Sequence, residues 1–134
     1  MNLRVLFVVA VACLFANDAH AQASSTTPSA LGVWRGTSTC LVRPSACKDE
    51  VVVYHVTRMK TSDSVSIDAN KIVNGQEEEM GVLTCRLGTP ATQVTCTMRN
   101  GVWHFTVSAD SLVGELRLSD NTKFRDIRTA RAPR

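Results

Sequence analysis

The fold is set by the stretch CRLGTPATQVTCTMRNGVWHFTV, which runs from Cys85 to Val107. Within it, Asn100-Gly101 tolerates the positive φ that a two-residue type I′ turn requires at both positions, so it predicts a β-hairpin. The implied register places Met98 opposite Trp103. It also pairs Arg99 with Val102, Cys96 with Phe105 and Val94 with Val107. Because side chains alternate along a strand, this register puts every large apolar side chain of the hairpin on one face.

The preceding turn, Gly88-Thr89-Pro90, supports the same face through the cysteines. If Cys85 lies opposite Cys96, Leu87 meets Val94 across the strands. The same register brings Leu83 to Met98. The register from the Asn100-Gly101 turn and the register from the cysteine pair therefore place the apolar side chains on the same face. Together they predict a Cys85–Cys96 disulfide within a hairpin that faces the core.

Short β-rich runs continue on both sides of this stretch, separated by Gly, Pro, Asn, Asp and Ser clusters. This rhythm is typical of a β-sandwich or β-barrel, and no helix of useful length is evident. The expected strands are Val33–Cys40, Glu50–Lys60, Ser64–Ala69, Lys71–Asn74, Met80–Leu87, Thr92–Arg99, Val102–Val107, Leu112–Leu118 and Lys123–Thr129. The third and fourth of these can also form one bent strand.

A second close pair of cysteines, Cys40 and Cys47, predicts a second disulfide, although four cysteines allow three pairings. It would close a loop around Arg43-Pro44-Ser45. The implied register places Trp34 opposite Val53 and Gly36 opposite Val51. Neither pair has the two-residue gap of a zinc knuckle or of a redox-active Cys-x-x-Cys motif, so both bridges are predicted to be structural.

The start of the chain predicts a cleaved signal peptide over residues 1–21. Arg4 precedes the apolar run Val5–Ala16, which is shorter than the roughly 20 residues of a membrane-spanning helix, and Ala19-His20-Ala21 provides small residues for cleavage. Cleavage after Ala23 and lipid modification of Cys13 are the alternatives. The expected location is periplasmic or secreted, which permits disulfides, with no transmembrane segment in the mature chain.

Composition predicts one modest domain. The expected parts are a flexible tail over residues 22–30, a β-barrel domain over 31–130 and a basic tail over 131–134. The net charge of +3 gives no broad electrostatic field for nucleic acid, so no nucleic-acid partner is expected. A monomer without cofactor or metal is predicted.

The opening Gly32-Val33-Trp34, the successive hairpins and the arginines Arg125 and Arg128 on the last strand resemble the calycin superfamily, the lipocalin and fatty-acid-binding-like barrels. The resemblance implies an all-β fold: a single antiparallel up-and-down barrel of about eight strands, here with two disulfides. It also implies that the indole of Trp34 packs at the closed end of the barrel beneath Arg125 or Arg128, through a cation–π contact.

An eight-stranded barrel is either filled by side chains or holds one small ligand. The expected inward side chains are Leu83, Leu87, Val94, Met98, Trp103, Phe105, Leu112, Leu116 and Leu118. These form an apolar set that suits a filled core better than a large cavity. The candidate ligand-binding residues are His55, Trp34, Trp103 and Phe105, with His55 turned to the same side as Trp34 by the first-hairpin register and His104 turned outward.

No catalytic constellation accompanies these residues, so the protein is not expected to be an enzyme. Glu77-Glu78-Glu79 is expected in a solvated loop, and the repeat of Arg125, Arg128, Arg131 and Arg134 in a solvated strand end and tail. The predicted function is an exported binding or interaction module for a small apolar ligand or an extracytoplasmic protein. The alternative resembles small periplasmic protease-inhibitor barrels that act through an N-terminal segment, here Gln22 to Ala30.

Overall fold

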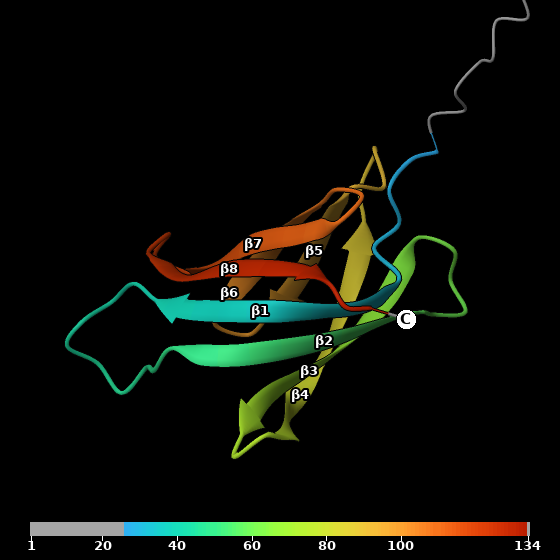
Figure 1. The fold of residues 1–134 in the computed structure, drawn as a ribbon. Helices are drawn as coiled ribbons and strands as arrows, with labels where there is room; N and C mark the ends of the chain where they lie inside the picture. The colour runs from blue at the N-terminus through green and yellow to red at the C-terminus, as the bar shows by residue number, and fades with distance from the viewer. Residues whose placement is uncertain (1–25, 134) are drawn as a thin grey trace, which may run out of the picture.

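The protein is an eight-stranded antiparallel β-barrel, closed by pairing of the first and last strands (Figure 1). A computed structural model describes residues 26–133. Its strands are β1 Gly32–Cys40, β2 Glu50–Arg58, β3 Ser64–Val73, β4 Gln76–Leu87, β5 Gln93–Met98, β6 Gly101–Val107, β7 Ser111–Leu118 and β8 Lys123–Arg131. Within the described residues no helix has the length and apolar character needed to cross a membrane.

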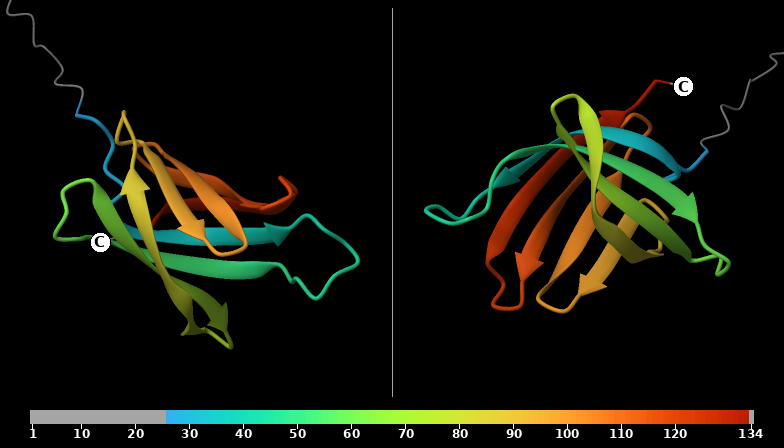
Figure 2. Two further views of the ribbon diagram at one scale, coloured as in Figure 1. Left: turned by 180° about the vertical axis from the view of Figure 1, so that it is seen from behind. Right: turned by 90° about the horizontal axis from the view of Figure 1, so that it is seen from below.

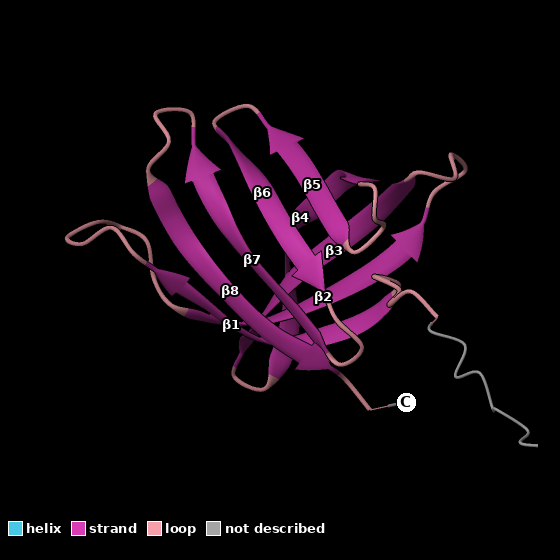
Figure 3. Ribbon diagram, turned by 90° about the horizontal axis from the view of Figure 1, so that it is seen from above, coloured by secondary structure: helices cyan, strands magenta, loops and turns pink. Residues whose placement is uncertain are grey.

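The predicted all-β, up-and-down barrel with two disulfides is confirmed, because each strand pairs with its neighbours in sequence. Figure 3 shows β5 to β8 side by side in one wall of the barrel. The runs expected over 64–69 and 71–74 form one strand, β3, with a register shift between Ala69 and Asn70. The bent-strand alternative was therefore correct.

The two-residue turn with positive φ at both positions is Asn74-Gly75, with φ of 50° and 80°, and it joins β3 to β4. The expectation that Asn100-Gly101 forms this turn was wrong. Gly101 is the first residue of β6 and pairs with Met98. A Cβ at Gly101 would clash with the carbonyl oxygen of Arg117, so the glycine permits the close approach of β6 and β7 rather than a turn.

The register of β5 and β6 is consequently displaced by two residues from the predicted one. Cys96 lies opposite Trp103, and Val94 lies opposite Phe105. A displacement of two keeps each side chain on its face, because side chains alternate with a period of two. The prediction that Trp103 and Phe105 face the interior while His104 is exposed is therefore confirmed.

The register of β1 and β2 is displaced by one residue from the predicted one. A displacement of one moves the side chains of β2 to the opposite face of the sheet. Trp34 pairs with Tyr54 and Gly36 with Val52, whereas Val53 and Val51 were expected. The prediction extended the register from a pairing of Cys40 with Cys47, but Cys47 lies in the connecting loop, where the chain is not paired as a strand. Val52, Tyr54 and Val56 therefore join the core.

Trp34 closes one end of the barrel, where β1 begins and β8 ends. Its side chain is fully buried, and its indole Nε1 donates a hydrogen bond of 2.8 Å to the carbonyl oxygen of Ala30. The guanidinium of Arg131 lies over the ring, 4.0 Å from its centroid, and donates to the carbonyl oxygens of Ser29 and Leu31. The covering arginine is thus Arg131, the last residue of β8, and neither Arg125 nor Arg128.

The core fills this end of the barrel. Of the predicted inward set, Val94, Phe105, Leu112 and Leu116 are buried, and Leu83, Leu87, Trp103 and Leu118 are partly buried. Met98 was predicted to be buried but is 40% exposed. Its exposure marks the opposite end, where β4 and β5 separate.

We expect Trp34→Ala to lower the free energy of unfolding by about 3 to 5 kcal/mol, because the indole is fully buried beneath Arg131. Chemical denaturation measures the change. Val33→Ala, at the neighbouring position that is 36% exposed, is the matched control and should cost about 0.5 kcal/mol or less. Equal effects of the two substitutions would contradict the role of Trp34 as the closing side chain.

The Cys85–Cys96 disulfide joins β4 to β5 next to the two residue pairs that connect these strands, Arg86 with Thr95 and Leu87 with Val94. Replacing both cysteines by serine should cost about 3 kcal/mol by loop entropy. It should also speed amide hydrogen exchange at Gly88, which donates to the carbonyl oxygen of Gln93 across the seam, and at Thr95. Replacing Cys40 and Cys47 is the control, and it should leave exchange at Gly88 and Thr95 close to that of the parent protein after correction for global stability.

Candidate functional site

A small hollow opens where β4 and β5 part. In the right view of Figure 2, the tip of the β3–β4 hairpin and the tip of the β5–β6 hairpin lie on opposite sides of the barrel. The hollow has a volume of about 160 Å³. Its lining is almost wholly apolar and consists of Ala69, Met80, Gly81, Leu83, Met98 and Trp103. A site with this lining can bind an apolar group but has no titratable side chain for chemistry.

Trp103 forms one wall of the hollow and is held in place by its neighbours. Its ring stacks on Phe105 with centroids 5.8 Å apart and planes 4° apart, and Phe105 meets Tyr54 edge to face at 6.0 Å. The indole Nε1 lies 3.0 Å from Sδ of Met98, to which it donates. Such aromatic contacts restrain the ring, so the wall is preformed.

The course of β3 and β4 explains why the hollow is not filled. The register shift after Ala69 leaves Met80 as an extra residue between Glu79 and Gly81, because Ala69 pairs with Gly81 and Asn70 with Glu79. Gly81 has φ of 155°, and no heavy atom lies within 4 Å of the position that a Cβ would take. Bulges bend a strand, and the absent side chain leaves space beside Trp103.

An acidic run borders the hollow along β4. Glu77, Glu78 and Glu79 are exposed residues of this strand, so the expectation of a loop was wrong. Oε2 of Glu77 accepts a 2.7 Å hydrogen bond from Nδ2 of Asn70 and lies 2.7 Å from Nε2 of His55. The hydrogen bond from Asn70, followed by that from His55, lowers the pKa of the Glu77 carboxyl.

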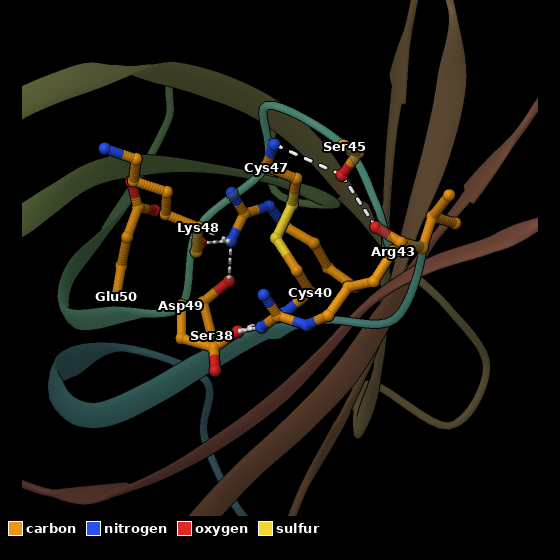
Figure 4. Close-up of a disulfide and its surroundings, with 10 residues drawn as sticks. Ser38, Cys40, Arg43, Ser45, Cys47, Lys48, Asp49 and Glu50 are labelled. Carbon is orange, nitrogen blue, oxygen red and sulfur yellow. Dashed lines mark hydrogen bonds and ion pairs between the residues drawn. A yellow bond between two sulfur atoms is a disulfide. The ribbon is translucent and has the colours of Figure 1, made fainter.

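The polar cluster at the base of the Cys40–Cys47 loop has a structural role. Arg125 donates to Oγ of Ser38 at 2.9 Å and to the carbonyl oxygen of Lys48 at 3.1 Å. Nearby, burial raises the pKa of Tyr54 well above that of a free phenol. Asp49 ties the loop to β1 by accepting from the backbone N–H of Cys40 at 2.8 Å, as Figure 4 shows around the disulfide. These groups hold the loop in place.

The structure brings together two of the four predicted ligand-binding residues, Trp103 and Phe105. Trp34 lies at the other end of the barrel beneath Arg131. His55 was expected to turn toward the side of Trp34, but it lies on the outer face, paired with Val33 and bonded to Glu77.

Sequence reasoning missed Ala69, Met80 and Gly81 as lining residues of the hollow. The available signal was a glycine inside a strand pattern, which often marks a bulge or a close approach of another group. That signal locates Gly81 but not the residues that face it.

The segment predicted to be a flexible tail, residues 22–30, ends in the barrel. Ala30 is buried, and the carbonyl oxygen of Ser29 accepts a 2.8 Å hydrogen bond from Arg131. This part therefore helps to seal the Trp34 end. Residues 22–25, and the predicted signal peptide over residues 1–21, lie outside the described residues.

No protein-family model matches this chain, and comparison with curated proteins finds no match either. The two disulfides, Cys40–Cys47 and Cys85–Cys96, are typical of proteins that work in an oxidising, extracytoplasmic environment. In residues 26–133, no three side chains of His, Cys, Asp or Glu gather to hold a metal ion.

We expect the Glu77 carboxyl to titrate below the ordinary range of a glutamate when its carboxyl carbon is followed by NMR. A lowered pKa in the folded protein means that the stabilising contribution is present above the ordinary pKa and is lost as the pH falls through the folded value. Asn70→Ala and His55→Phe should each raise the pKa of Glu77, because each removes a hydrogen bond to its carboxylate. The titration of Asp120, in the β7–β8 turn, should not move in either variant; an unchanged pKa of Glu77 in both variants would contradict the assigned contacts.

Proposed function

We propose that this protein is an exported binding module that accepts a small apolar group in the hollow beside Trp103. The observation that carries the proposal is the hollow itself, an apolar space bounded by a preformed aromatic wall. Exposed methionines at its rim suit such a role, because their flexible side chains adapt to ligands of different shape. Met80 and Met98 are 41% and 40% exposed.

The size of the hollow limits what it can accept. Pockets for drug-sized ligands measure about 300 to 1,000 Å³, whereas this one measures about 160 Å³. An engineered protein cavity of about 150 Å³ binds benzene. The ligand group is accordingly a single ring or one aliphatic side chain, not a whole lipid.

Export to the periplasm or the cell exterior is part of the same proposal. Its support is the signal-peptide pattern over residues 1–21 together with the two disulfides. The contact of Arg131 with Trp34 supports the calycin-like resemblance, in which an arginine of the last strand covers the tryptophan of the first. A binding role also fits the lining, which offers no acid, base or nucleophile.

Benzene tests the hollow directly. In ¹H–¹⁵N and ¹H–¹³C NMR titrations, we expect saturable shifts of the Trp103 indole N–H and of the methyl groups of Met80 and Met98, respectively. The Trp34 indole, buried at the other end, is the internal control and should not shift. Ala69→Leu should fill the hollow and abolish the saturable shifts. Shifts that rise linearly without saturation, or that persist in a folded Ala69→Leu variant, would refute the proposal.

A further inference from the structure

β4 has a free backbone edge beside the hollow. One side of this strand pairs with β3 along its whole length, from Val73–Gln76 to Ser64–Arg86. The other side pairs with β5 only through Arg86 and Leu87. Among the described residues, the segment 76–84 therefore lacks a strand partner on one side.

Such an edge presents backbone donors and acceptors that readily pair with another chain. Elsewhere in the barrel, neighbouring strands pair over most of their shared length. The segment 76–84 is thus the place where this closed fold offers an edge. At about 3.3 Å per residue, it extends roughly 30 Å, enough for an extended peptide of about seven residues.

Exposed apolar side chains accompany the edge. Val82 is 56% exposed on β4, Met80 is 41% exposed at the bulge, and Met98 is 40% exposed on the facing strand β5. Met80 and Met98 line the hollow together with Trp103. A strand lying along β4 would consequently meet both backbone hydrogen-bonding groups and a pocket sized for one side chain.

The charge on the edge favours a basic occupant. Glu77 is engaged by Asn70 and His55, but Glu78 and Glu79 make no ion pair within residues 26–133. Opposite charges on neighbouring strands stabilise pairing, and like charges oppose it. A second copy of this chain would bring the same acidic run into the interface, so the edge suits a different polypeptide.

We infer that the partner is an extended segment of another polypeptide that adds to β4 as an extra strand. One of its apolar side chains enters the hollow, and its lysine or arginine side chains face Glu78 and Glu79. In this mode of recognition the main chain provides affinity and the pocket provides specificity. The inference rests on the proposed function of the hollow and names the occupant.

An acetylated and amidated heptapeptide that alternates lysine with valine or leucine is the probe. Added to the full folded protein, it should cause saturable NMR shifts at the amides of residues 76–84 and at the Trp103 indole. Hydrogen exchange of the amides on the free edge should slow at least tenfold at saturation. Binding should weaken as salt is added, because exposed charges are screened.

A second peptide and two protein variants separate the contributions. The same peptide N-methylated at alternate residues keeps its side chains but loses the main-chain donors on one edge, and it should not bind. Glu78→Gln combined with Glu79→Gln should weaken binding about two- to tenfold, as expected for two exposed ion pairs. Asp110→Asn, which removes a carboxylate in the loop beside the Trp34 end, is the control and should leave binding unchanged.

The outcomes distinguish this inference from the proposed function. If benzene binds but the peptide leaves residues 76–84 unaffected, or if the N-methylated peptide binds equally well, the added strand is overturned and the hollow stands. If benzene does not bind either, both are overturned. Protection of the β4 edge that rises with protein concentration in the absence of peptide would show a second copy on the edge and would also overturn the inference.

Discussion

The ring of strands depends on the disulfide between Cys85 and Cys96. β4 and β5 share only two residue pairs, Arg86 with Thr95 and Leu87 with Val94, so hydrogen bonds alone give this seam little support. The buried bridge holds the strands together next to those pairs. Because the covalent link fixes one end of the seam, the other end can open without opening the barrel.

The two ends of the barrel consequently differ. At one end Trp34 fills the interior, and Arg131 lies on its ring and holds the chain segment that covers it. At the other end the bulge after Ala69 bends β4, and Gly81, which has no side chain, lines the hollow with Trp103. The sealed end is therefore filled by buried side chains, whereas the other end holds the apolar hollow.

Local sequence patterns did not predict the register of two strand pairs correctly. For β5 and β6 the predicted register was displaced by two residues, and the faces of Trp103 and Phe105 were still correct. For β1 and β2 it was displaced by one, and His55 lies outside instead of inside. The first error assigned the turn to Asn100-Gly101, although Gly101 is needed for the close approach of β6 and β7. The second extended the register of the first hairpin from the Cys40–Cys47 pair, although Cys47 lies in the connecting loop.

By itself the sequence determined the fold class, the strand order, both disulfides and the burial of Trp34 at one end of the barrel. These features follow from strand alternation, close cysteine spacing and turn residues, which act over short stretches of chain. The tertiary structure decided which arginine covers Trp34 and that the turn with two positive φ angles lies at Asn74-Gly75. It also decided that β4 pairs with β5 over only two residues. These features depend on how eight strands fit around one closed ring. The hollow beside Trp103 arises from residues on four strands, so no single stretch of the sequence contains it.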